Sequence, residues 1–282
     1  MIKKILLTVS GLGHAEEMLK TLKEVPAIQQ AEVTVLHVVP AQASAQVMTS
    51  KWEEGGKILG SAIETVNLDA SKVTAILRQG DPKDVVCQVA DEINADLIIM
   101  GSRGLKRLQS ILANSVSQYV FQLSSRPMLL VKDDIYIKKI KRVMVAIDGT
   151  DATKQCLQLA LFLVRDIKGG ELILVHVDKN SSSKSSETAT PAENNPVLAP
   201  AISEAKKQGV QPRVIATAGK PAEEICRLAQ DQDVGLLIIG SPDRRPSIAK
   251  SFVDIDRLLS ASLSDYVRVN ATCPVLLART VG

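Results

Sequence analysis

The sequence predicts an α/β fold of two tandem, doubly wound, parallel five-stranded sheets, each an α/β sandwich of Rossmann-like type. Three observations lead to this prediction. First, the 282 residues are 45% hydrophobic but only 2% aromatic, so the core must be aliphatic, as in parallel sheets covered by helices. Second, the sequence repeats itself. Third, short apolar runs alternate with helix-like segments, which predicts parallel strands joined by crossover helices.

The repeat has a nearly constant offset, and its matches keep the same order in both copies. GDPKDVVCQVAD, from Gly80, matches GKPAEEICRLAQ, from Gly219, 139 residues further on. RPMLLVK, from Arg126, matches CPVLLAR, from Cys273, 147 residues further on. The second copy therefore carries eight extra residues before its last helix and strand. Such a pattern predicts a duplicated domain.

We expect a first domain over 1–134, a linker over 135–141 and a second domain over 142–282. The linker is short and charged, so the two copies should pack against each other as an internal pseudo-dimer. Pairing of their last strands would cover two exposed sheet edges at once. The polar, Ser-rich segment 180–196 predicts a flexible loop in the second domain.

The elements of the first copy follow from local patterns. A helix over Asp81–Ile93 opens with Asp81-Pro82, a cap followed by a first-turn proline. Another helix, from about Gln42 to Val66, carries the only tryptophan, Trp52, which we expect to pack on the sheet. The strands are short apolar runs, as expected for strands buried on both faces. They are Ile5–Val9, Val33–Val38, Lys72–Leu77, Leu97–Met100 and Met128–Val131.

Composition excludes several classes of protein. A net charge of +3 is too small to indicate a nucleic-acid surface. No apolar run is long enough to span a membrane, and the N-terminal run is too short for a signal peptide. The four cysteines form no CxxC pair and indicate neither zinc nor a disulfide framework. We therefore expect a cytoplasmic protein that binds neither nucleic acid nor membrane.

One stretch, IIMGSRGLKRLQSILANSVSQYVFQ from Ile98, has the pattern of a phosphate-binding loop. Gly101 and Gly104 would let the main chain approach a ligand. Asn114-Ser115 then opens a helix, whose N-terminus attracts anions. Arg103 adds positive charge nearby. Taken alone, the spacing favours an ordinary turn and an N-cap, and it matches neither GxxxxGK[ST] nor GxGxxG.

In its context, however, this stretch resembles the universal stress protein family. The glycine spacing lies between IIMGS and a SxxYV helix, and VAIDGTDATKQCLQLAL, from Val145, resembles the family's first strand and helix. The resemblance covers nearly all of the chain as a tandem pair. It implies the α/β sandwich argued above and, in many members, ATP binding. The family holds adenine near the ends of the first two strands and the phosphates on the glycine loop.

The resemblance implies one largely intact loop and one altered loop. In the first copy Gly101, Gly104 and Ser115, followed by Val116, match the phosphate loop, and Asn114 replaces a third glycine. Val38 matches the position whose main chain meets adenine, but Ser10 replaces an Asp that contacts the nucleoside.

In the second copy Asp148 and Val177 match the nucleoside positions. After Gly240, however, Pro242 and Asp243 replace the loop pattern, and the second glycine is lost. The resemblance leaves two readings of the second copy, a site for a smaller or different ligand and a structural partner of the first copy. We favour a ligand site in the first copy and a mainly structural second copy.

No catalytic set emerges from the residue patterns, so we do not expect an enzyme. His37 and His176 occupy equivalent strand positions, which indicates packing with one ring nitrogen satisfied. Cys87 and Cys226 are equivalent on a helix and are expected to act as small buried hydrophobes rather than a redox pair. No residues indicate a metal site in the protein itself, and Mg²⁺ would be held only through a bound nucleotide.

Three hypotheses remain open. The first is a stress-response regulator that binds ATP, AMP or ADP mainly in the first domain. The second is a nucleotide-independent scaffold, and the third is a slow ATPase. The expected partners are an adenine nucleotide and the second copy within the chain. A homodimer of chains is left open, and no protein partner is indicated.

Overall fold

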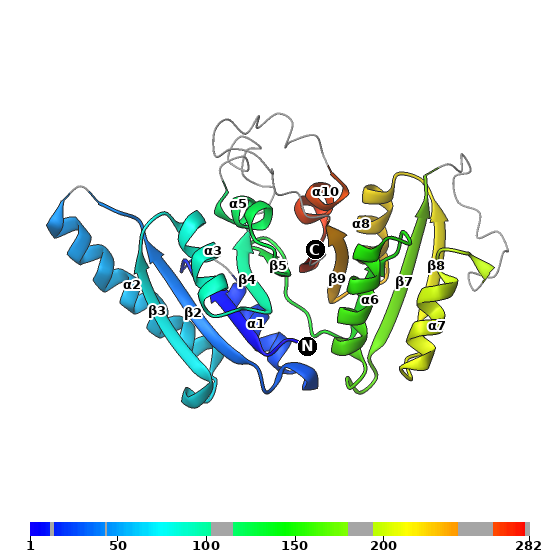
Figure 1. Ribbon diagram of the computed structural model, residues 1–282, viewed down its shortest axis with the longest axis horizontal. Coiled ribbons are helices and arrows are strands. Elements are labelled where there is room, and N and C mark those ends of the chain that lie inside the picture. The colour runs from blue at the N-terminus through cyan, green and yellow to red at the C-terminus, as the bar shows by residue number, and fades with distance from the viewer. Residues whose placement is uncertain (12–13, 43, 103–114, 180–193, 242–261, 280–282) are drawn as a thin grey trace. The chain divides into compact units, whose positions relative to one another are not determined.

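The computed structural model describes residues 1–11, 14–42, 44–102, 115–179, 194–241 and 262–279. The chain divides into two compact units, the first of Met1–Glu24 and Ile28–Ile137 and the second of Lys138–Gly282 with Val25–Ala27. Figure 1 labels elements of both units. Residues Arg103, Gly104 and Asn114, the altered loop of the second copy and most of the predicted 180–196 loop lie outside the described residues.

The first unit alternates strands and helices along its whole length. Its described strands and α-helices, in chain order, are β1 (Lys4–Thr8), α1 (Ala15–Lys23), β2 (Glu32–Val39), α2 (Ala45–Val66), β3 (Val73–Gln79), α3 (Pro82–Glu92), β4 (Leu97–Ser102), α5 (Val116–Leu123) and β5 (Met128–Lys132). The order across the sheet is β3-β2-β1-β4-β5, and the strand pairs are parallel. The predicted doubly wound sheet is confirmed.

The second unit repeats this plan. Its described elements are β6 (Arg142–Ala146), α6 (Asp151–Val164), β7 (Glu171–Asp178), α7 (Ala199–Lys207), β8 (Arg213–Ala218), α8 (Pro221–Asp231), β9 (Leu236–Ser241), α10 (Leu263–Asn270) and β10 (Val275–Arg279). Its order is β8-β7-β6-β9-β10, again with parallel pairs. The repeat seen in the sequence is therefore a repeat of the fold.

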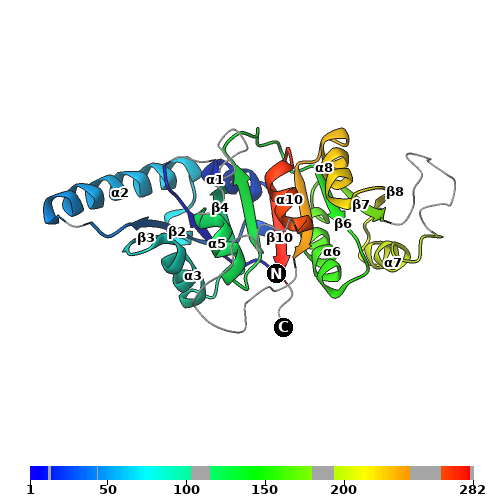
Figure 2. The same ribbon diagram turned by 90° about the horizontal axis from the view of Figure 1, so that it is seen from above.

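Helices cover both faces of each sheet, which explains the aliphatic strands. In the first unit α1 lies beside α2 on one face, and α3 lies beside α5 on the other (Figure 2). In β1 every residue from Ile5 to Thr8 is buried, and so is every residue of β4 from Leu97 to Met100. Burial on both faces removes the alternation of polar and apolar residues that a half-exposed strand would show.

The start of α3 follows the predicted capping pattern. The side chain of Asp81 accepts the main-chain N–H of Lys83 at 2.9 Å, and Pro82 occupies the first turn. This cap orients α3 as it leaves the carboxyl end of β3, the end of the sheet where the candidate site lies.

Helix α2 is longer than the strand it follows, and this changes the expected place of Trp52. The helix has 22 residues, about 33 Å, against eight residues or about 26 Å for β2. Its buried residues begin only at Gly55, so its first turns extend past the sheet. Trp52 is 36% exposed rather than packed on the sheet as predicted.

No helix among the described residues is long and apolar enough to cross a membrane.

Candidate functional site

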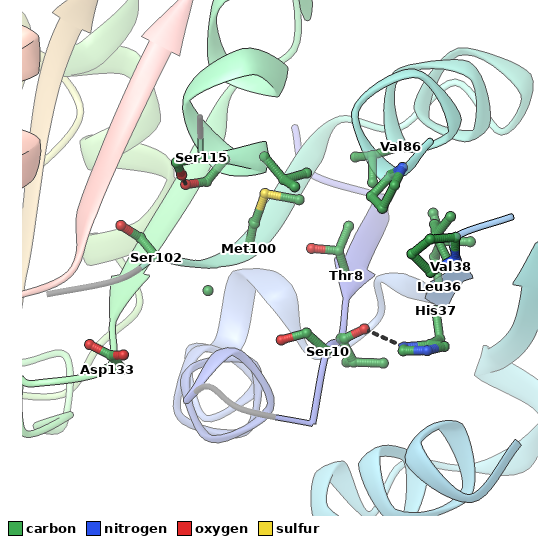
Figure 3. Close-up of a pocket in the computed structure, with 16 residues that line it drawn as sticks. Thr8, Ser10, Leu36, His37, Val38, Val86, Met100, Ser102, Ser115 and Asp133 are labelled. Carbon is green, nitrogen blue, oxygen red and sulfur yellow. Dashed lines mark hydrogen bonds between the residues drawn. The ribbon is translucent and has the colours of Figure 1, made fainter. Parts of the chain in front are cut away.

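A cavity of about 420 Å³ opens in the first unit, at the carboxyl ends of its strands. The chain continues from β1 to β2 on one side of β1, whereas β4 lies on the other, so the order of strands reverses here. Open α/β sheets bind ligands at such a reversal. The lining residues come from the ends of β1, β2, β4 and β5 and from the starts of α3 and α5 (Figure 3). They are Thr8, Val9, Ser10, Leu36, His37, Val38, Pro40, Pro82, Val86, Met100, Gly101, Ser102, Ser115, Val116, Ser117 and Asp133.

Five residues selected from the sequence lie together on the wall of this cavity. They are Ser10, Val38, Gly101, Ser115 and Val116. They come from the ends of β1, β2 and β4 and from the start of α5, and the parallel sheet brings the three strand ends to one edge. Asp148 and Val177, also selected from the sequence, belong to the second unit.

The main chain of Val38 faces the space beyond the end of β1. The N–H of Val9 bonds to the carbonyl of Leu36 at 2.9 Å, so the polar groups of Leu36 point toward β1. Val38 lies two residues further along β2, and its N–H and C=O point to the same side. Since β1 ends at Thr8, these groups border the cavity rather than another strand.

His37 is anchored at the same place. Its Nδ1 lies 2.8 Å from the carbonyl oxygen of Val9 (Figure 3). A carbonyl can only accept, so Nδ1 carries the proton in this contact. His176 makes the same contact with the carbonyl of Ile147, also at 2.8 Å. The prediction that one ring nitrogen is satisfied is confirmed in both units.

The N-terminus of α5 forms another part of the wall. Ser115 is the N-cap residue, and its side chain caps no N–H of the first turn. Its hydroxyl instead lies 2.7 Å from the hydroxyl of Ser117. The first N–H groups of a helix have no partner within the helix, and they carry its positive partial charge. This end of α5 can therefore accept an anion.

The corresponding helix of the second unit is closed by its own side chains. Ser262, the N-cap of α10, accepts the N–H of Asp265 at 3.2 Å and donates its hydroxyl to the Asp265 carboxylate at 2.7 Å. Arg268 lies 3.5 Å from the same carboxylate. A carboxylate at the helix start occupies the place that an anionic ligand would need.

Asp148 also has a structural partner. Its Oδ1 accepts the main-chain N–H of Thr150 at 2.9 Å and the hydroxyl of Thr150 at 2.6 Å. Thr150 is the N-cap residue of α6. The carboxylate that the family resemblance assigns to a nucleoside contact therefore stabilises the entry of the chain into α6.

The cavity contains one acidic group that sequence reasoning missed. Asp133 follows β5, and its N–H bonds to the carbonyl of Ser102 at 3.0 Å, which holds it beside the end of β4. It became identifiable only once β5 was placed next to β4 in the sheet. Among the described residues, no group of three or more His, Cys, Asp or Glu side chains could hold a metal ion.

Two of the cysteines are poor nucleophiles. Burial, together with the negative charges of Asp91 and Asp84, raises the pKa of the half-buried Cys87 thiol on α3 to about 11. Burial raises the pKa of Cys156 on α6 to about 12, with Asp148 adding to the effect. Both thiols stay protonated near neutral pH, which agrees with a packing role.

Several further cavity residues that the sequence did not indicate lie at the ends of strands or at the start of a helix. Thr8 is the last buried residue of β1, and Met100 is the last buried residue of β4. Pro82 and Val86 lie in the first turns of α3. The rule that ligands bind at the carboxyl ends of parallel strands would have found Thr8 and Met100.

Both halves of the chain are similar to known proteins. The model of the "Universal stress protein family" matches residues 1–132 and again 139–279. Universal stress protein Sll1654 of Synechocystis is 32% identical over 135 residues, which cover 46% of this chain and 86% of that protein. Universal stress protein YxiE of Bacillus subtilis is 29% identical over 148 residues, covering 47% of this chain and all of that protein.

A solved structure matches both units together. The crystal structure of a universal stress protein from Archaeoglobus fulgidus has a TM-score of 0.74 and 20% sequence identity. It covers 98% of this chain, and this chain covers 96% of it. At this identity the likeness concerns the fold.

Proposed function

This chain belongs to the universal stress protein family as a tandem member, and we propose that it is a stress-response regulator that binds one adenine nucleotide, in the cavity of its first unit. Its output would be a change of conformation or partner rather than a chemical product. ATP is the proposed ligand, with AMP or ADP as alternatives.

The observation that carries this proposal is the convergence of five sequence-selected residues on one cavity. The family resemblance of the sequence points to Ser10, Val38, Gly101, Ser115 and Val116, and all five line this cavity. Their cavity of about 420 Å³ falls within the usual range for small-molecule sites.

Two walls of the cavity suit two parts of a nucleotide. The N–H and C=O of Val38 can pair with the N1 acceptor and the 6-amino donor of adenine. The uncapped start of α5 at Ser115 can receive phosphate oxygens, and Gly101 allows close approach from the end of β4. Arg103 and Gly104 lie outside the described residues and are proposed to complete the phosphate site.

The second unit is proposed to be mainly structural. The start of α10 is occupied by Asp265, and Asp148 bonds to Thr150, the N-cap residue of α6. The Asp265 carboxylate is engaged by the side chains of Ser262 and Arg268, and the Asp148 carboxylate is engaged by Thr150.

A second candidate is a scaffold that works without nucleotide. Ser10 stands where the family has a carboxylate for the nucleoside, and Asp133 places a negative charge on the cavity wall. Both features weaken a nucleotide site, and only measured binding separates the two candidates.

The experiment is to denature the purified chain, identify any released nucleotide by mass, and titrate ATP into the emptied protein by calorimetry. We expect one ATP per chain. Gly104→Val should abolish binding without unfolding the protein, because its side chain would enter the space of the phosphates. Two ATP per chain would contradict the structural role of the second unit, and no binding would favour the scaffold.

A further inference from the structure

The ladder between β1 and β2 stops one hydrogen bond earlier than its register allows. Thr8 is paired with Leu36, which makes Val9 the register partner of His37. In a parallel ladder, a residue that donates to one strand position accepts from the position two residues later. Val9 donates to Leu36 at 2.9 Å, so its carbonyl is placed to accept the N–H of Val38.

The side chain of His37 takes that place. Its Nδ1–H donates to the Val9 carbonyl at 2.8 Å. Among the described residues, no main-chain hydrogen bond joins Val9 to the N–H of Val38. The imidazole thus replaces the next rung of the ladder, and the N–H of Val38 is left at the cavity wall.

The second unit shows the same substitution. Ala146 is paired with Val175, and the N–H of Ile147 bonds to the carbonyl of Val175 at 2.7 Å. The carbonyl of Ile147 then accepts from Nδ1 of His176 at 2.8 Å, where the ladder would offer it the N–H of Val177. The bond is therefore a property of the repeated fold and not an accident of one unit.

The surroundings of His37 hold the ring in this orientation. A Cβ on Gly55 of α2 would lie 2.9 Å from Cδ2 of His37, so the helix main chain packs directly on the imidazole. A ring confined on this side keeps its Nδ1 at the Val9 carbonyl. The Val38 N–H is therefore unpaired before any ligand binds, so binding need not first break a main-chain hydrogen bond.

We infer that His37 is a positioning residue that keeps the Val38 N–H unpaired and available to the acceptor edge of a purine base. His37 bonds to the Val9 carbonyl, and the Val38 N–H, not the imidazole, contacts the base. This inference rests on the proposed function for the identity of the ligand, but its structural half can be measured without a ligand.

The structural half is tested by amide hydrogen exchange of the nucleotide-free, full-length chain, resolved by residue with NMR. In the wild-type chain the Val38 amide should exchange much faster than that of Leu36. His37→Leu removes the donor and lets the Val9 carbonyl accept from Val38, so exchange at Val38 should slow by about tenfold or more. His37→Asn has nearly the same shape as Leu and keeps a donor at the place of Nδ1, so Val38 should stay fast.

The functional half is tested by the affinities for ATP and ITP. Hypoxanthine presents a donor at N1 and an acceptor at C6, the reverse of adenine, so a presented Val38 main chain should prefer ATP. His37→Leu should weaken ATP binding by about tenfold and reduce the ATP-to-ITP preference. His37→Asn should restore both. A role in stability alone would not change the preference between the two bases.

His176→Leu is the matched control. It should slow amide exchange at Val177 as His37→Leu does at Val38, yet leave ATP affinity unchanged. The inference is overturned if Val38 is as protected as Leu36 in the wild-type chain, or if the Leu and Asn variants at position 37 behave alike. If the wild-type chain binds no nucleotide, the proposed function fails, and exchange at Val38 still decides whether His37 controls that N–H.

Discussion

Ser262 and Asp265 close the start of α10 by a reciprocal pair of hydrogen bonds, in which the Ser262 hydroxyl donates to the carboxylate at 2.7 Å and accepts the Asp265 N–H at 3.2 Å. The first unit has the same serine, Ser115, but Gln118 stands three residues later instead of an aspartate. One carboxylate thus separates a helix start that can receive phosphate from one that cannot.

Copying this carboxylate into the first unit should close its site. Gln118→Asp is expected to weaken ATP binding by about tenfold, because a negative charge at the start of α5 repels phosphate and competes for its N–H groups. Calorimetry measures the affinity. Gln122→Asp adds the same charge near the other end of the same helix and should leave the affinity almost unchanged. Equal losses in the two variants would contradict a phosphate site at Ser115.

Two glycines of α2 should respond oppositely to alanine. A Cβ at Gly55 would lie 2.9 Å from side-chain atoms of both His37 and Leu77, so Gly55→Ala should lower the free energy of unfolding by about 1–3 kcal/mol. A Cβ at Gly60 meets nothing within 4 Å, so Gly60→Ala should raise it by about 0.5–1 kcal/mol through helix propensity. Urea titration measures both, and a stabilised Gly55→Ala chain would show that α2 does not pack so closely on β2.

Asp133 should make nucleotide binding depend on Mg²⁺. Its carboxylate on the cavity wall repels phosphate when no metal is present. Asp133→Asn should therefore tighten ATP binding by about twofold to fivefold in EDTA, since the residue is exposed and the interaction is screened. With Mg²⁺ the gain should disappear. An equal increase in ATP affinity with and without Mg²⁺ would show that the effect of the Asp133 carboxylate does not depend on the metal.

The buried thiol of Cys156 should make stability fall at alkaline pH. Its pKa is raised to about 12 in the folded chain, so the folded state holds the proton more tightly than the unfolded state does. This contribution is complete below the ordinary thiol pKa, and it is lost as pH rises toward 12, by at most about 1.4 kcal/mol per pH unit. In urea titrations at pH 8, 9.5 and 10.5, Cys156→Ala should show a shallower loss than the wild-type chain. Parallel curves would contradict the buried, protonated thiol.

The fold could be predicted because its signals are local and repeated. Apolar runs such as Leu97–Met100 mark buried strands, and Asp81-Pro82 marks a helix start, without knowledge of any neighbour. The ring orientation of His37 could not be predicted, since it depends on where β1 ends beside β2. Asp133 enters the cavity only through the pairing of β5 with β4. The sequence contains the difference between Gln118 and Asp265. Its effect on anion binding follows only when both residues are placed three positions after the N-cap serine of a helix.

The overhang of α2 gives the chain a built-in optical reporter. Trp52 is the single tryptophan, so tryptophan emission reports on the first unit alone, whereas far-ultraviolet circular dichroism records the helices of both units. Because the indole is 36% exposed, its emission should be partly quenched by acrylamide in the folded chain. If the two signals change together during denaturation, the halves of the chain melt cooperatively. If they separate, each half has its own stability, and ATP should shift the tryptophan transition selectively.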